Sequence, residues 1–146
     1  MANITAAAVN ELRKRTGVGM MDCKKALVEC DGDMDKAIDY LREKGQKLAA
    51  KRADRDASEG AVLATVNADK TFAAVIMMNC ETDFVAKNED FVAFTREVLQ
   101  TAVDAKAKSL EEVMALTING LSVETMIVEQ VAKIGEKITL SHYYPI

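Results

Sequence analysis

The sequence predicts an α+β fold, in which a three-helix bundle precedes a small antiparallel sheet packed with helices. Three observations lead to this prediction. The N-terminal third carries apolar stripes at helical spacing, and two later apolar runs of strand length flank a polar turn. Aromatic residues make up only 5% of the chain, which has no tryptophan and 8 methionines, and this favours a helix-rich fold over a sandwich or a barrel.

Each of the first three helices has a recognisable start or stop. Thr5 can cap the first helix, and Gly17 can supply the left-handed residue that ends it. The second helix stops at Gly32. The apolar spacing of the third stops near Gly45, and a brief helical run at 46–52 follows. Stripes of this length can close on one another as a compact bundle.

A polar segment, 54–60, separates this bundle from a stretch in which apolar runs of strand length replace the helical stripes. We therefore expect two domains, 1–53 and 54–146. In the second domain, the apolar runs 61–66 and 71–78 predict a β-hairpin. The later run is apolar on both faces, so we expect it to be the central strand of its sheet.

Three helices and one more strand are expected after the hairpin. A long amphipathic helix spans 88–106, and a short helix lies near 110–116. A third helix, 122–134, ends at Gly135, and the segment 137–144 alternates like a strand. The second domain should therefore place helices on one face of a small antiparallel sheet.

Charge and hydropathy exclude several classes of protein. A net charge of −4 and a pI near 5.1 argue against nucleic acid as the main partner, because phosphate-backbone binding needs a basic surplus or a dense basic face. The basic residues within 44–55 are diluted by acidic neighbours, which fits a solvated helix end better than an RNA site. No apolar run is long enough to span a bilayer, and the N-terminus lacks the pattern of a signal peptide. We therefore expect a cytoplasmic protein with no membrane partner.

No group of residues predicts catalysis or ligand binding. The single histidine, His142, has no partners at metal-ligand spacing. The acidic residues from Asp31 onward imitate the start of an EF-hand loop, but Lys36 and Arg42 stand where that loop needs glycine and glutamate. No glycine-rich phosphate-binding motif occurs, so direct nucleotide binding is not expected. The sequence predicts a binding module with no metal and no cofactor, rather than an enzyme.

The segment 16–25 needs a functional explanation. A double-glycine turn there delivers Met20 and Met21 to the very start of a helix, ahead of the stripe that packs inward. Two adjacent flexible apolar side chains suit an adaptable binding surface. Either methionine could equally cover the core of the bundle, and the residues alone leave both interpretations open.

The segment 79–91 poses a similar question where the predicted central strand leads into a helix. Thr82 can cap one short helical turn, on which Asp83 and Phe84 project about 100° apart. An acid and a large ring at this angle cannot both point into one small core. On composition alone, a buried Phe84 beside a capping Asp83 is the simpler arrangement.

Four runs of residues resemble those of the elongation factor Ts family. They are 12–27, which contains the methionine turn; 32–42; 82–88, which reads Thr-Asp-Phe-Val-Ala-Lys-Asn; and 131–136. Their order and spacing resemble those of the family along essentially the whole chain. Motifs of this length are highly specific.

The resemblance implies that 1–53 is a ubiquitin-associated-like domain with a linker helix, which docks on the GTPase elongation factor Tu. It further implies that 54–146 is the first lobe of the family's core and that the chain promotes GDP release without binding nucleotide itself. The residues carried over as docking contacts are Leu12, Met20, Met21, Lys24, Ile134 and Gly135. Those carried over to the magnesium and phosphate region of the GTPase are Thr82, Asp83 and Phe84.

The sequence departs from the family pattern at its C-terminus, since typical members continue with a second core lobe and this chain stops at Ile146. We expect either a C-terminally incomplete fragment or a short form that completes its core as a homodimer. Two other functions remain open. One is a ubiquitin-associated-like adaptor that catalyses no exchange, and the other is a protein that binds RNA through the basic stretch.

Overall fold

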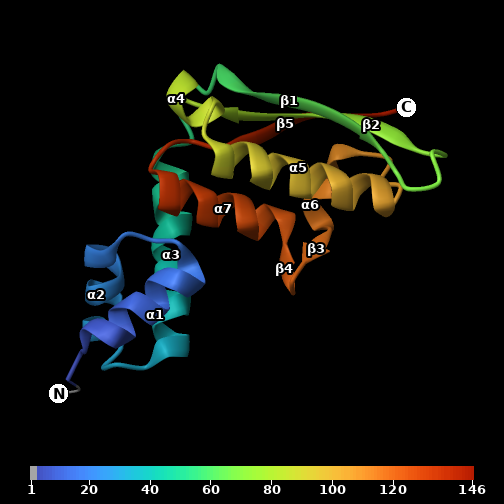
Figure 1. Cartoon of the computed structure of the whole chain (residues 1–146). Helices are drawn as coiled ribbons and strands as arrows, with labels where there is room; N and C mark the ends of the chain where they lie inside the picture. The colour runs from blue at the N-terminus through green and yellow to red at the C-terminus, as the bar shows by residue number, and fades with distance from the viewer. Residues whose placement is uncertain (1–2) are drawn as a thin grey trace. The chain divides into compact units, whose positions relative to one another are not determined.

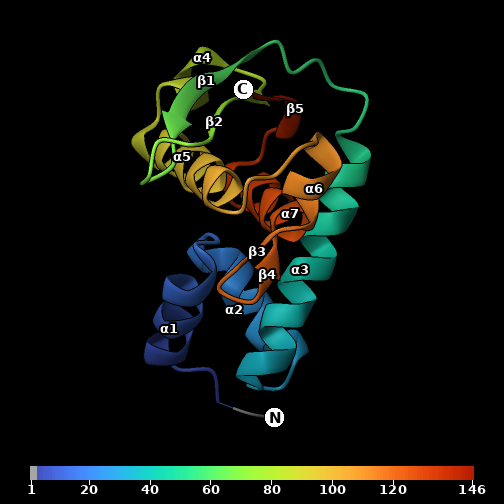
Figure 2. The ribbon, with the colours of Figure 1, turned by 90° about the vertical axis from the view of Figure 1, so that its right-hand side faces the viewer.

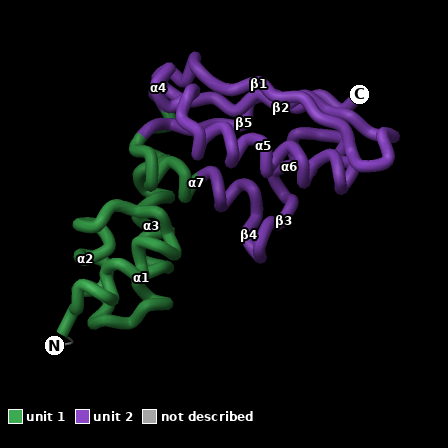
Figure 3. The backbone as a smooth tube through the Cα atoms, in the orientation of Figure 1, with its two compact units in different colours: residues 1–53, 128–135 green, residues 54–127, 136–146 purple. Residues whose placement is uncertain are grey.

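The computed structural model describes residues 3–146, and the fold is α+β, as predicted. The chain divides into two compact units, shown in different colours in Figure 3. The first consists of Met1–Ala53 and Val128–Gly135, and the second of Asp54–Ile127 and Glu136–Ile146. Within the described part of the chain, no helix is both long and apolar enough to cross a membrane.

The first unit contains the helices α1 (Ala6–Thr16), α2 (Met20–Glu29) and α3 (Met34–Lys51), labelled in Figure 1. The predicted caps of α1 are present. Thr5 Oγ1 accepts a hydrogen bond from the Ala8 N–H at 3.1 Å, and Gly17 has a φ of 71°. One apolar core joins the three helices. Its buried members are Val9, Leu12, Val18, Cys23, Ala26, Leu27, Ala37 and Leu41.

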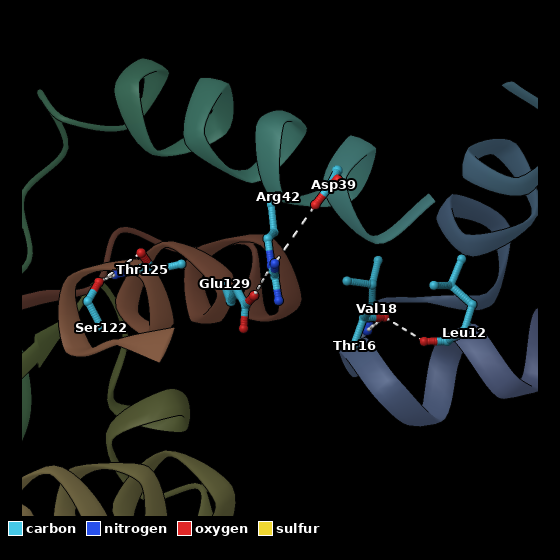
Figure 4. A network of polar contacts seen from close by, with 8 residues as sticks. All are labelled: Leu12, Thr16, Val18, Asp39, Arg42, Ser122, Thr125 and Glu129. Atoms are coloured by element: carbon cyan, nitrogen blue, oxygen red, sulfur yellow. Dashed lines mark hydrogen bonds and ion pairs between the residues drawn. The ribbon is translucent and has the colours of Figure 1, made fainter. Parts of the chain in front are cut away.

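The prediction that the third helix stops near Gly45 was wrong, because α3 continues without a break to Lys51. A glycine inside a helix costs about 1 kcal/mol relative to alanine, but here it makes room for a neighbour. A Cβ at Gly45 would lie 3.0 Å from the Cβ of Ala132 in α7 (Val123–Ile134). Beside this close approach, Arg42 Nε donates to Glu129 Oε1 at 2.9 Å (Figure 4).

The second unit is built on a three-stranded antiparallel sheet with the order β1 (Glu59–Val66), β2 (Ala73–Cys80) and β5 (Thr139–Pro145). The middle position of β2 confirms the prediction from its doubly apolar pattern. The helix α5 (Glu89–Asp104) covers one face of the sheet, as Figures 1 and 2 show. Four residues spaced along one side of this amphipathic helix are fully buried: Phe91, Thr95, Val98 and Ala102.

A short hairpin, with two residues in each strand, was not predicted. It follows α6 (Leu110–Ala115) and joins β3 (Thr117–Ile118) to β4 (Leu121–Ser122). Its turn residues are an Asn-Gly pair with φ values of 52° and 84°, the positive values that such turns require. The strands are too short to show an alternating pattern in the sequence.

The long helix α5 starts at a side-chain cap whose loss should be measurable. Asn88 Oδ1 accepts hydrogen bonds from the N–H groups of Asp90 and Phe91 at 2.9 and 3.3 Å. Substitution by alanine leaves these donors without that partner, so Asn88→Ala should lower the free energy of unfolding by about 1 kcal/mol. Urea unfolding measures the change. Asn88→Asp keeps the acceptor and should retain most of the stability, whereas an unchanged midpoint for Asn88→Ala would show that the cap contributes nothing.

Candidate functional site

The short helix α4 (Asp83–Ala86) forms a corner between β2 and α5, and it carries the most exposed large apolar side chain among residues 3–146. Phe84 is 83% exposed, so its ring is not part of the core of the second unit. Thr82 caps this helix as predicted, with its Oγ1 accepting from the Val85 N–H at 3.4 Å. The corner therefore presents an acid, Asp83, and an aromatic ring to solvent side by side.

Glu136 fixes this corner from a distant part of the chain. Glu136 Oε1 accepts hydrogen bonds from the N–H groups of Glu81 and Thr82, both at 3.1 Å, and Glu136 Oε2 accepts from Thr82 Oγ1 at 2.8 Å. Glu136 was not among the predicted site residues. Nothing in the local pattern signals such a pairing, because the partners are about 55 residues apart in sequence.

Both acidic and basic side chains lie near the corner. Asp83 faces a cation only at the outer limit of an ion pair, with its Oδ2 at 4.0 Å from Lys87 Nζ, and both side chains are largely exposed. Burial, followed by the nearby charge of Glu136, raises the pKa of the Cys80 thiol to about 11. At neutral pH this thiol is therefore protonated, and it donates to the carbonyl oxygen of Thr82 at 3.2 Å rather than acting as a nucleophile.

A second exposed surface lies at the start of α2. Met20 and Met21 are 50% and 70% exposed, so neither is buried in the bundle core. With Lys24 they line a groove of about 350 Å³, whose other wall comes from the start of α1 and the residues just before it, and includes Val9 and Ile4. We call this feature the methionine groove. Its apolar side chains and the lysine at its edge suit it to bind the surface of another protein.

The remaining predicted residues occupy different environments. Leu12 is fully buried in the same core as Val9, so it can support the methionine groove from beneath but offers no surface itself. Ile134 is half-buried at the end of α7, and Gly135 ends that helix with a φ of 82° and an N–H that donates to the Val131 carbonyl. The structure therefore brings Met20, Met21 and Lys24 together in the first unit. It brings Thr82, Asp83 and Phe84 together in the second.

No cluster of three or more histidine, cysteine, aspartate or glutamate side chains among the described residues could hold a metal ion. What the molecule offers instead is apolar surface. An exposed aromatic ring on a capped corner and a methionine groove can both bury area against a partner protein.

Comparison with known proteins identifies relatives along the chain. A family model described as "Elongation factor TS" matches residues 81–146, and one described as "Elongation factor Ts, mitochondrial, N-terminal" matches residues 1–49. The elongation factor Ts of Christiangramia forsetii is 56% identical over 143 residues, which cover 98% of this chain and 52% of that protein. Those of Flavobacterium johnsoniae and Rhodopirellula baltica are each 54% identical, with 98% and 97% of this chain and 44% and 43% of theirs covered. The chain thus spans about half the length of the curated relatives it matches.

Proposed function

Because this chain belongs to the elongation factor Ts family, we propose that it binds elongation factor Tu in the cytoplasm and promotes the release of GDP. The observation that carries the proposal is the corner at α4, where Phe84 is 83% exposed beside Asp83. A phenyl ring this exposed offers a large apolar area that a partner protein can bury.

Promoting release requires no reactive group. A factor that binds the nucleotide-free GTPase more tightly than the loaded one weakens nucleotide binding by the same factor, because the two equilibria are linked. Only contacts that form with the open GTPase contribute to this difference. Contacts that form equally in both states raise the affinity but do not drive release.

In this mechanism Phe84 is the selective contact. Seating its ring in a pocket of the GTPase is worth roughly 1.5–3 kcal/mol, and the pocket exists only when the magnesium and phosphate region has opened. Opening moves groups that hold Mg²⁺, and the loss of that cation removes much of the charge that retains the phosphates. Asp83 adds a carboxylate at the same place, and the Thr82 cap helps to hold the helix that carries Asp83 and Phe84.

The methionine groove serves as the general docking surface in this proposal. Met20, Met21 and Lys24 contact the GTPase domain, and Leu12 supports them from the core. The segment Ile134–Gly135 adds a further contact. Residues 1–53 act as the docking domain and 54–146 as the first lobe of the core, with a homodimer as one way for a second lobe to be supplied.

The size of the complex with bacterial elongation factor Tu, measured by light scattering with and without GDP, tests this function. We expect a stable complex in the absence of nucleotide and dissociation when GDP is added. A complex that forms equally well with GDP would contradict exchange and favour a simple adaptor. No complex under either condition would remove elongation factor Tu as the partner.

A further inference from the structure

The α4 corner has little internal structure to hold its shape. The helix has only four residues, none of them buried, and an isolated helix of this length is unstable in water. Phe84 itself makes little contact with the unit that carries it, since 83% of its surface is exposed. The orientation of the ring therefore depends on what fixes the backbone on either side of it, including the residues just before it.

The carboxylate of Glu136 supplies that support. It accepts hydrogen bonds from two consecutive backbone N–H groups, those of Glu81 and Thr82, and from the Thr82 hydroxyl. Thr82 is the residue that caps α4, so Glu136 holds both the backbone and the side chain of the cap. Bonds to an ionised acceptor are about twice as strong as neutral ones.

The hydrogen bonding runs in both directions, because the Glu81 side chain in turn accepts a hydrogen bond from the backbone next to Glu136. Glu81 Oε1 accepts from the N–H of Lys137, the residue after Glu136, at 3.2 Å. Glu81 Oε2 lies 3.5 Å from a guanidinium nitrogen of Arg55, and its side chain is only 13% exposed. Each glutamate thus binds the backbone beside the other. The segment 136–137 is thereby fastened to the residues that precede α4.

We propose that Glu136 is a positioning residue for exchange: its carboxylate fixes Thr82 and thereby aims the Phe84 ring at the GTPase. This inference rests on the proposed function, since a ring has to be aimed only if it acts on a partner. Glu136 itself need not touch the GTPase. Glu136 also directly follows Gly135 in the sequence. The residue that holds the corner is therefore next to the segment Ile134–Gly135, which we propose as a further contact with the GTPase.

Hydrogen exchange of the backbone amides tests the positioning without any partner. In Glu136→Ala we expect the protection of the Glu81 and Thr82 amides to fall at least tenfold, together with the amides of α4, while the strands and α5 stay protected. Glu136→Gln keeps one oxygen that can accept from both amides and should retain most of the protection. The matched control is Glu97→Ala, an exposed glutamate on α5. Unchanged protection in Glu136→Ala would overturn the proposal, as would a loss spread over the whole second unit.

A double-mutant cycle on GDP release then separates positioning from general destabilisation. Glu136→Ala should slow stimulated release of a fluorescent GDP analogue from elongation factor Tu roughly tenfold, and it should slow nothing further when Phe84 is already alanine. Additive effects would contradict an action through Phe84. If the unmodified chain fails to stimulate release, the proposed function falls, whereas the exchange of the amides still decides whether Glu136 holds the corner.

Discussion

Phe84→Ala is expected to slow the release of GDP from elongation factor Tu, at a saturating concentration of the chain, by about 10- to 150-fold. The range follows from the roughly 1.5–3 kcal/mol that a phenyl ring gains on burial, at one factor of ten for each 1.36 kcal/mol. Stopped-flow fluorescence of a labelled GDP analogue measures the rate. Assembly with the nucleotide-free GTPase should persist, because the methionine groove is intact.

A loss of stability should not account for slower GDP release by the Phe84→Ala variant. Phe84 is exposed and α4 has no buried residue, so the variant should unfold at nearly the same urea concentration as the unmodified chain. Val62→Ala, which removes an apolar side chain that is 57% exposed on β1, is the matched control and should leave the release rate unchanged. If Phe84→Ala releases GDP at the normal rate, the ring has no part in the mechanism.

Replacing both Met20 and Met21 with alanine should weaken docking in every nucleotide state. We expect the Kd for elongation factor Tu to rise about 30-fold, which corresponds to roughly 1 kcal/mol for each methionine at an interface. Isothermal titration calorimetry with and without GDP measures both values. The ratio between the two should stay the same, because uniform contacts shift affinity without selecting the open state.

Helix α2 offers its own control for this prediction. Val28 is 56% exposed on the same helix but does not line the methionine groove, so Val28→Ala should bind normally. Equal weakening by Val28→Ala would indicate a nonspecific effect on α2. A change confined to the GDP-bound state in the double methionine variant would contradict the assignment of the groove to general docking.

The parts of the fold that could be predicted are those set by neighbouring residues. Thr5 and Thr82 cap helices where the sequence indicated, because a cap depends only on the few amides that follow it. The burial pattern of α5 and the central place of β2 follow from apolar periodicity, which is also a local signal.

The parts that could not be predicted depend on contacts between distant segments. A glycine at position 45 predicts a helix end, and the close approach to Ala132 that explains it instead does not show in the sequence. Glu136 was missed because its partners lie about 55 residues away. The composition around Phe84 favoured a buried ring, and only the geometry of the corner turns that ring outward. The roles of the site residues in binding stay predictions.

The most direct test of the central claim is to measure the affinity of the chain for elongation factor Tu with and without GDP. The ratio of the two affinities gives the coupling between GDP and the chain. For the unmodified chain we predict that GDP weakens binding by at least tenfold, and that in Phe84→Ala this factor shrinks toward one while binding to the GDP-loaded form is unchanged. A Phe84→Ala variant that GDP still displaces as strongly as the unmodified chain would contradict the account.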